Sequence, residues 1–580
     1  MIQKYQLRNG IKVLLIPTHK APVVSVQTWV NTGSADEGKG EEGISHFIEH
    51  LLFKGTDKYK VGEIASIVES SGGELNAYTS FDQTVFYVTI SKNFTDVAFD
   101  TVSQMMGSPK FDESEIDNER EVVIEEIKRS FDSPHRMSSR LLFSTSYQKH
   151  PYRLPVLGFD ENIKKVSSKT LKNYFHSRYV PQNMIVVVTG DFNESEIKNK
   201  VDKYFGGFKK YSLRKVKRPI ESDQNQARVV VEKSSFKETF LNFSWHIPGV
   251  KHKDIPALDL LSVVLGTGES SRLFKAMRLE RNLVSSIGSG AFTPKDKGLF
   301  YISAQLDSKN LSETLEMIGE EITSVWMNPI SEEEISKAKL ILESEDFYSM
   351  ETVGGLARKY GNYEQLLGDV NYFEKYIALL NKVTSAQLTE VARKYLEPKK
   401  ANISALVNEE PAEIQKKLHS WVERLNDVSE LVHREPLTKQ KLKIGGERLQ
   451  FHSKTTKSEV KTITLDNGAK IFLYPNFDTP TVSVKMAFLG GLKVEPDGKG
   501  GVLDLLSSTW TTGTDKRSER EINEMFDSSA SGVGAFSGRN TVGLSLTTLS
   551  PFIDRTLDAT FEILKSPSFE PAIIAREKEV

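Results

Sequence analysis

The chain of 580 residues has no cysteine, which excludes disulfide bonds and any metal site built on thiolates. A metal ion would therefore have to be held by histidine and carboxylate side chains. The absence of cysteine does not choose a compartment, because a protein without cysteine is compatible with both a reducing cytosol and an oxidising periplasm.

An excess of charge of one sign is also missing. The 76 basic side chains nearly balance the 78 acidic ones, and the formal net charge is −2. This argues against nucleic acids and anionic membranes as partners, because both require concentrated positive charge. No apolar run approaches the roughly 20 residues of a membrane span, and residues 1–5 lead into a strand pattern without a signal peptide. We therefore expect no membrane span.

The most informative feature that is present is a pair of histidines four residues apart with a carboxylate between them. Positions i, i+3 and i+4 share one face of a helix, so His46, Glu49 and His50 would converge. Two neutral imidazoles at this spacing suit a zinc ion, and the carboxylate is placed to take a proton from a water molecule. The order H-x-x-E-H is typical of an inverzincin. The alternative is a solvated helix face with ordinary charges.

A second, carboxylate-rich helical segment follows at residues 119–127. With it the chain resembles the pitrilysin/insulinase family of zinc metallopeptidases, which includes the mitochondrial processing peptidases. In that family a downstream glutamate completes the zinc site, and Glu126 matches it. Glu119, two turns earlier on the same helix face, matches a glutamate that supports a ligand. Residues elsewhere in the first third carry the same family pattern: Gly43, Ser45, 51–56, 72–79, 150–152, Pro155, Gly158, 179–184, Gly190 and Asp191.

The resemblance implies a zinc-dependent endopeptidase with one Zn²⁺ per chain. Its metal ligands would be His46, His50 and Glu126. Glu49 would deprotonate the attacking water and later pass a proton to the leaving amine. The substrates would be peptides or unfolded segments. The compartment is not determined by the sequence: the bacterial cytoplasm or periplasm is expected for a soluble chain, and secretion stays open. The edge strand beside the site would pair with an extended substrate through three residues: Asn76, Ala77 and Tyr78.

An internal repeat is the second large feature of the chain. Residues 9–17 recur as residues 467–475, at an offset of 467 − 9 = 458. A self-match at one fixed offset indicates a duplicated structural unit. The repeat replaces the three motif residues by Asp504, Ser507 and Ser508. We therefore expect a second copy that keeps the fold without the metal chemistry.

The same offset maps Glu119 onto Glu577 and would place the counterpart of Glu126 beyond Val580. We therefore expect a fragment, whose partner would be a missing C-terminal part or a second chain. The resemblance implies that the last domain of the family supplies an arginine and a tyrosine that help to bind and polarise the substrate carbonyl. The fragment would bind zinc and cut slowly without that part.

The order of strand and helix patterns predicts an α+β protein made of duplicated half-shells around a chamber, with the second half truncated at residue 580. Each half-shell would hold two related domains with antiparallel sheets and helices on one face. We expect a catalytic domain at 1–215, a related domain at 225–410, a helical and polar linker at 411–457 and a partial third domain at 458–580. The predicted strands lie at 23–30, 85–90, 184–188, 228–232, 239–246, 298–306 and 401–407, and the predicted helices at 43–53, 61–70, 94–106, 113–131, 255–265, 312–326 and 331–353.

Two alternatives remain open at this level. Some members of the family bind substrate or build a respiratory complex without cutting, and a fragment could be inert without its remaining part. Non-catalytic members usually lose motif residues, whereas all four are present here. The glycine-rich segment 266–271 superficially suggests a phosphate loop, but it lacks the lysine of a P-loop, so we expect a structural role for it.

Overall fold

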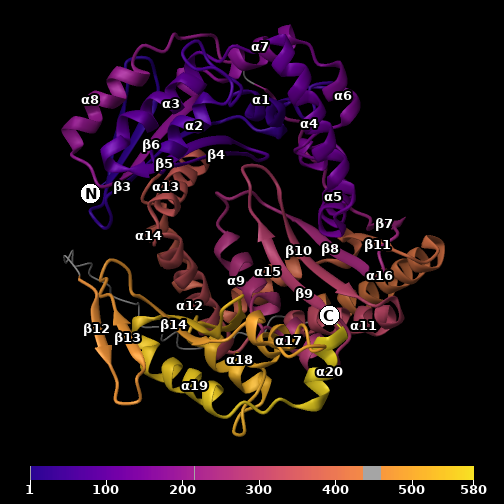
Figure 1. The fold of residues 1–580 in the computed structure, drawn as a ribbon. Helices are drawn as coiled ribbons and strands as arrows, with labels where there is room; N and C mark the ends of the chain where they lie inside the picture. Colours follow the sequence, from indigo (N-terminus) through magenta and orange to yellow (C-terminus); the bar gives the residue numbers. More distant parts are fainter. Residues whose placement is uncertain (1, 215, 435–458, 580) are drawn as a thin grey trace.

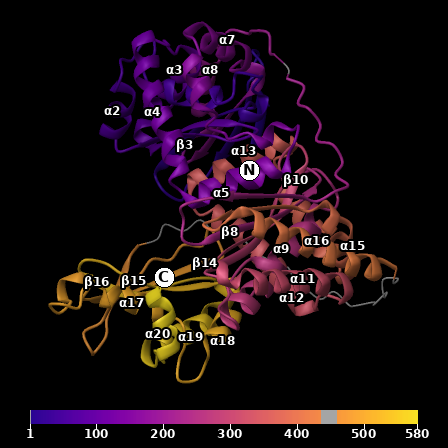
Figure 2. The same cartoon turned by 90° about the vertical axis from the view of Figure 1, so that its right-hand side faces the viewer.

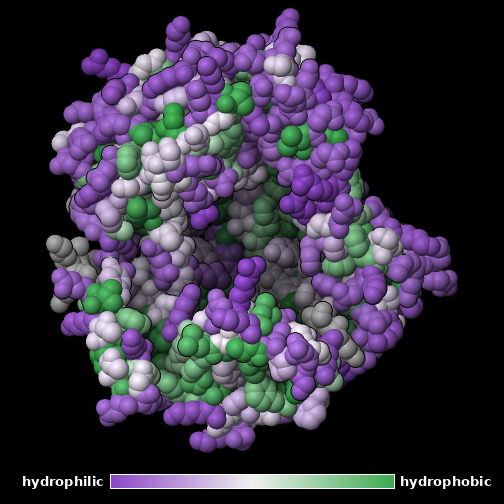
Figure 3. Space-filling view, in the orientation of Figure 1, coloured by the Kyte–Doolittle hydropathy of each residue, from purple (hydrophilic) through white to green (hydrophobic). Residues whose placement is uncertain are grey.

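The computed structural model describes residues 2–214, 216–434 and 459–579. Three units built on β-sheets surround a central hollow (Figure 1), and the hollow is open to solvent in the space-filling view (Figure 3). Residues 208–214 and 216–227 lead from the first unit to the second (Figure 2). In the described parts of the chain, none of the helices is both long and apolar enough to cross a membrane.

The first unit is a six-stranded sheet with the order β1-β2-β6-β3-β5-β4. The prediction of an antiparallel sheet is wrong at one pairing, because β2 and β6 run parallel and make the sheet mixed. They can do so because a long helical excursion separates them in sequence, and parallel neighbours need such a crossover. The strands are β1 (Gln3–Gln6), β2 (Lys12–Pro17), β3 (Val23–Val30), β4 (Glu74–Thr79), β5 (Thr84–Ser91) and β6 (Met184–Gly190).

Helices from the first third of the chain cover one face of this sheet with an apolar core. The helix predicted at 113–131 has those bounds in the structure, because its start is marked by acidic residues and its end by basic ones. The helices are α1 (Ile44–Leu51), α2 (Glu63–Ser70), α3 (Thr95–Gly107), α4 (Glu113–Phe131), α6 (Asp160–Lys165), α7 (Ser168–Arg178) and α8 (Glu194–Phe205).

The second unit is a five-stranded sheet with the order β7-β11-β8-β10-β9. It is also mixed, because β7 and β11 are parallel. Its strands are β7 (Arg228–Lys233), β8 (Thr239–Ile247), β9 (Ser286–Phe292), β10 (Gly298–Leu306) and β11 (Asn402–Val407), and its helices are α9 (Ile255–Gly266), α10 (Arg272–Phe274), α11 (Leu311–Met327), α12 (Glu332–Ser349), α14 (Tyr372–Lys382), α15 (Ser385–Tyr395) and α16 (Pro411–Arg434).

Two element boundaries in this unit differ from those predicted from the sequence. The helix expected at 331–353 ends at Ser349, and a new helix begins at Val353. The first part of the predicted linker forms α16, whose Trp421 is buried and donates a hydrogen bond to the carbonyl oxygen of Leu315 at 2.6 Å. Residues 411–434 thus pack with the second sheet, and residues 435–457 of the predicted linker lie outside the described ranges.

The first two units exchange one helix each, which corrects the expectation of helices on a single face. Helix α13 (Val353–Leu367) lies on the open face of the first sheet, where its Gly361 meets the ring of Trp29. Helix α5 (Pro134–Ser146) lies in turn on the open face of the second sheet (Figure 1). Both faces of each sheet are therefore covered, which explains why β3 and β6 are buried along almost their whole length.

A partly buried ionic cluster also ties these two units together. The guanidinium of Arg218, in the extended connection, pairs at 2.9 Å with Asp36 of the first unit and at 2.9 Å with Asp296 of the second. A buried ion pair is costly to break from one side, because the remaining charge stays uncompensated. The cluster therefore fixes how the two sheets sit relative to each other.

The third unit shares the bounds of several elements with the first unit. A shift of 458 residues superposes the bounds of α1, β4 and α3 on three of its elements without adjustment, and the isolated bridge between Thr56 and Pro109 recurs between Thr514 and Pro567. The described elements of this unit are β12 (Lys461–Thr464), β13 (Lys470–Leu473), β14 (Thr481–Leu489), α17 (Val502–Thr509), α18 (Glu519–Asp527), β15 (Gly532–Ser537), β16 (Thr541–Leu549), α19 (Ile553–Lys565) and α20 (Pro571–Glu579).

The third unit packs against the second through the glycine-rich segment 266–271. The backbone N–H of Ser270 donates to Asp527 at 2.7 Å, and Gly268 lies so close to the same carboxylate that a side chain there would clash. The hydroxyl of Tyr348 adds a hydrogen bond to the carbonyl of Ala530 at 3.0 Å. This segment therefore has the predicted packing role.

Candidate functional site

The short helix α1 presents the inverted motif at the inner surface of the first unit. Gly43, with a positive φ of 100°, precedes the helix, and the carboxylate of Glu37 accepts hydrogen bonds from the N–H groups of Gly43 and Ser45, both at 2.8 Å. This carboxylate satisfies donors that a helix start leaves free and complements the helix dipole. In the third unit Glu495 makes the same two contacts at the start of α17. The cap belongs to the duplicated fold.

Helices α1 and α4 bring three ligand atoms to one point. Nε2 of His46 and Nε2 of His50 lie 3.7 and 3.5 Å from Oε2 of Glu126, and all three atoms lie within 4.8 Å of one another. Ligand atoms about 2.0–2.2 Å from a tetrahedral zinc ion are separated from each other by roughly 3.3–3.5 Å. The three side chains therefore fit a zinc ion with one position left open.

The orientation of the histidines is set by the side chains behind them. Nδ1 of His50 lies 2.8 Å from Oε1 of Glu119, whose other oxygen accepts from Lys54 at 2.7 Å. This contact directs the second nitrogen of His50 at the centre, as outer carboxylates do in zinc sites. Nδ1 of His46 is buried and has no hydrogen-bond partner among the described residues, so only its Nε2 is engaged.

The protein surroundings shift the pKa values of the two imidazoles in opposite directions. Burial, together with the charge of His50, lowers the pKa of His46 to about 4, which keeps this ring neutral. Burial opposes protonation of His50 as well, but its hydrogen bonds to Glu119 and Glu126 raise its pKa to about 9. The two carboxylates beside His50 carry negative charge, and a bound cation would neutralise part of it.

Glu49 stands next to the ligand group and is not part of it. Its Oε2 accepts a hydrogen bond from Oγ1 of Thr79 at 2.5 Å, and the backbone N–H of Thr79 also binds this carboxylate. Burial raises the pKa of Glu49 above its ordinary value, and the contacts with Thr79 oppose that rise. A carboxylate of raised pKa beside an open metal position is suited to take up and return a proton.

The predicted substrate strand is β4, and it lies at the free edge of the first sheet. The backbone N–H of Ala77 is bound by the Oδ1 atom of Asn76 at 2.8 Å, so it points to the open edge and away from β5. Ala77 and Tyr78 line the cleft at the site, while Tyr78 also meets Trp29 edge to face at 6.4 Å. Asn76 does not line the cleft, and its side chain contacts its own strand and Tyr87 of the neighbouring strand β5.

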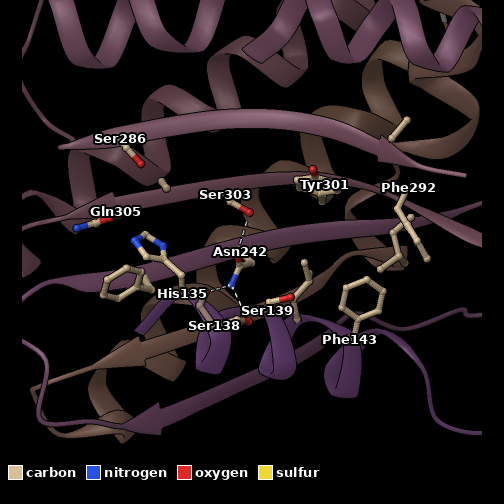
Figure 4. A pocket seen from close by; sticks show the side chains of 15 residues that line it. His135, Ser138, Ser139, Phe143, Asn242, Ser286, Phe292, Tyr301, Ser303 and Gln305 are labelled. Atoms are coloured by element: carbon tan, nitrogen blue, oxygen red, sulfur yellow. Dashed lines mark hydrogen bonds between the residues drawn. The ribbon is translucent and has the colours of Figure 1, made fainter. Parts of the chain in front are cut away.

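His46, Glu126 and Glu49 open onto a cleft of about 630 Å³ between α1, the edge strand β4 and α5, while His50 does not line it. A neighbouring cavity of about 450 Å³ lies on the face of the second sheet, and His135, Ser139 and Phe143 of α5 line both spaces. Figure 4 shows this cavity, with Asn242 hydrogen-bonded to Ser138 and Ser303 on its floor. Helix α5 thus lies between this cleft and a hollow on the second unit that is lined by both polar and apolar side chains.

Three contacts of the site were not predicted. The role of Thr79 on Glu49 could have been found from its place two residues after Ala77 on the same side of the strand. Glu37 carries no signal of its own in the sequence, because its contact with the start of α1 forms only in the fold. Lys54 belongs to the family pattern at 51–56, but its partner Glu119 lies on another helix, so the ion pair could not be read from the pattern.

The degenerate copy of the site lacks metal ligands in the structure as well. The hydroxyls of Ser507 and Ser508 donate back to the carbonyl oxygen of Asp504 at 2.8 and 3.3 Å. Glu577, the counterpart of Glu119, is held by Arg576 at 2.9 Å. Within residues 459–579 no group of three metal-ligating side chains comes together.

Comparisons with known proteins agree with this geometry. The model of the family described as insulinase (peptidase family M16) matches residues 12–160, and the model described as the peptidase M16 inactive domain matches residues 165–342. The uncharacterised zinc protease YmxG of Bacillus subtilis is 30% identical over 393 residues, which are 68% of this chain and 95% of the relative. The zinc protease PqqE of Helicobacter pylori is 31% identical over 398 residues, 67% of this chain and 89% of that protein.

Solved structures give the same result for the fold. The crystal structure of a protease from Helicobacter pylori covers 70% of this chain and 99% of its own, with a TM-score of 0.66 and 29% identity. The periplasmic protease PqqL from Escherichia coli covers the whole of this chain and 67% of its own, with a TM-score of 0.63 and 16% identity. At that identity the second likeness concerns the fold alone, and it includes all three sheet units.

Proposed function

The chain belongs to peptidase family M16, the insulinase family, and we propose that it is a zinc-dependent endopeptidase that cuts peptides and unfolded segments. The observation that carries the proposal is the convergence of three ligand atoms beside a separate buried carboxylate. Two nitrogens and one oxygen suit Zn²⁺ and leave a coordination position open, as in catalytic zinc sites.

In this proposal His46, His50 and Glu126 hold the ion, and Glu119 keeps His50 in the correct tautomer. Bound Zn²⁺ supplies a Lewis acid that polarises the scissile carbonyl and acidifies water. Glu49 takes the proton of the attacking water and passes it to the leaving amine, so that one carboxylate serves first as base and then as acid. The hydrogen bonds from Thr79 hold Glu49 in position for both transfers.

The edge strand β4 is proposed to bind the substrate as an added strand. The N–H of Ala77 points to the open edge one alternation away from Thr79, so a peptide paired there passes directly beside Glu49. Asn76, Ala77 and Tyr78 are the proposed binding residues, with Asn76 acting through its cap on the Ala77 N–H. Main-chain pairing requires an extended peptide, so a folded protein would have to unfold locally before it could be cut.

We further propose that residues 1–215 form the catalytic domain, 225–410 a related domain and 458–580 a partial domain without zinc. The hollow that these units surround supports a chamber for the substrate (Figure 3). A wall on several sides would admit flexible chains and exclude large folded ones.

The metal site is tested by zinc analysis of matched glutamate variants. The purified protein is expected to hold about one Zn²⁺ per chain, and chelators are expected to remove both the metal and the cleavage of peptides. Glu126→Gln should lose most of the zinc. Glu125→Gln is the control, because Glu125 is exposed on the same helix and pairs only with Lys128. Equal zinc content in the two variants would exclude Glu126 as a ligand.

The degenerate copy allows a complementary prediction. Changing Asp504, Ser507 and Ser508 together to Ala should leave the zinc content unchanged, because two hydroxyls and one carboxylate are poor competitors of imidazole for zinc. The two hydroxyls are moreover bound to the helix backbone. Metal analysis before and after the change checks this. Loss of an equivalent of zinc would overturn the single-site assignment.

A further inference from the structure

Three arginines line the same cleft as His46, Glu49 and Glu126. Arg136 and Arg140 are one helical turn apart on α5, so they share a face of that helix, and Arg153 ends the short 3₁₀ helix η3 (Pro151–Arg153) beside it. Arg136 lines this cleft together with Glu126 and Glu49. The guanidinium groups are therefore next to the reaction centre.

These arginines have no acidic partner among the described residues. The only carboxylates that line the cleft are Glu49 and Glu126, which are engaged with Thr79 and with the two histidines. Arg140 is instead held by aromatic rings, with its guanidinium 4.8 Å from the centre of Phe131 and 5.9 Å from that of Phe159. Stacking on rings fixes the plane of the guanidinium and leaves its N–H donors free.

An exposed guanidinium is ordinarily explained as a solvated side chain. Several arginines elsewhere in the chain differ from those of the cleft, because they are paired with carboxylates. Arginines near the other interfaces of the molecule are paired with carboxylates: Arg178 with Glu41, Arg218 with Asp36, Arg272 with Glu334 and Arg576 with Glu519. The net charge of −2 also shows that this group of arginines is a local feature and not a consequence of a basic protein. The three arginines outnumber the two carboxylates of the cleft, and a local excess of positive charge attracts anionic ligands.

We propose that Arg136 and Arg140, with Arg153, select substrates that carry a carboxylate close to the scissile bond. The proposal rests on the proposed peptidase function and adds its specificity. An extended peptide on the edge of β4 would present alternate side chains toward α5, and the planar guanidinium groups match a carboxylate with two parallel N–H donors. The aromatic and apolar side chains of the same cleft, Phe131 and Phe143 among them, would contact the aliphatic part of a Glu side chain.

The test compares peptides that differ by one functional group. In a fluorogenic peptide series, each position within three residues of the scissile bond carries Glu, Gln or Lys. We expect kcat/KM at one or more positions to be higher for Glu than for Gln by about 10-fold, the usual size for a charge-assisted hydrogen bond, and lowest for Lys. In the double variant Arg136→Gln, Arg140→Gln the ratio of Glu to Gln should fall toward 1, mainly through KM.

Arg424→Gln is the matched control, because Arg424 lies on α16, outside the cleft, and should keep the ratio of the unchanged protein. The thermal transition of each variant shows whether it is folded. A ratio near 1 in the unchanged protein, or one that survives the double substitution, would overturn the proposal. Direct binding of the Glu and Gln peptides, measured by fluorescence anisotropy, separates the two proposals, because absent cleavage with retained preference for Glu would contradict only the peptidase function.

Discussion

Replacement of Glu49 by Gln is expected to leave zinc bound and to slow peptide cleavage by about 10²–10⁴-fold, the range that a positioned acid–base group contributes. The amide keeps the size of the side chain and can still accept the hydrogen bond from Thr79. It cannot take a proton from water or return one to the leaving amine. The measurement is kcat for a fluorogenic peptide together with zinc content, on the same preparation.

Glu69→Gln serves as the control for this prediction, because Glu69 is an exposed glutamate of α2, a neighbouring helix of the same unit. Its zinc content and rate should match those of the unchanged protein. Retained activity in Glu49→Gln would show that another group is the base. Loss of zinc in that variant would show instead that Glu49 is a ligand, which the geometry does not indicate, because the three converging atoms belong to other residues.

The ligand set of the candidate site was predictable from sequence because helical periodicity determines which side chains share a face. The spacing of His46 and His50 suffices to place both on one side of α1, and the spacing of Glu119 and Glu126 does the same on α4. That these two helices meet was supplied by the resemblance to a known family. The repeat was equally visible, because an offset of 458 residues preserves glycines and turns as well as apolar periodicity.

The features that were missed depend on contacts between distant segments. The parallel pairing of β2 with β6 joins residues about 170 positions apart, and no local pattern distinguishes it from an antiparallel neighbour. The exchange of α5 and α13 between the two sheets is of the same kind. A helix that covers a neighbouring sheet has the same apolar stripe as one that covers its own.

The prediction for Asn76 illustrates the limit at the level of a single residue. The resemblance implied an edge strand at this position, and β4 lies at the free edge of the first sheet. The pattern does not reveal that the side chain of Asn76 binds the neighbouring N–H of Ala77. A short polar side chain of this kind readily bonds to nearby backbone, and this choice is made only in the folded strand.

The largest expected effect on stability concerns the helix that the second unit places on the first sheet. A Cβ atom added at Gly361 would lie 2.3 Å from the ring of Trp29, which is only 1% exposed. In an isolated helix, Gly→Ala is stabilising by up to about 1 kcal/mol. Here we expect Gly361→Ala to lower the free energy of unfolding by about 1–3 kcal/mol, the usual cost of overpacking, because both the ring and α13 are confined. The expected effect on stability is thus opposite in sign to that of the same substitution in an isolated helix, so the result reports on packing against Trp29.

Gly354→Ala is the matched control on the same helix, because the nearest atom to its added Cβ would be Oγ1 of Thr89 at 4.0 Å. It should leave the thermal transition unchanged or raise it slightly, whereas Gly361→Ala should lower it by several degrees. Trp29 also touches Tyr78 of the edge strand, so a displaced ring should disturb β4 and raise KM for peptides while zinc stays bound. Equal transitions in the two variants would mean that α13 can shift on the sheet at little cost. The exchanged helix would then not be what holds the substrate strand in place.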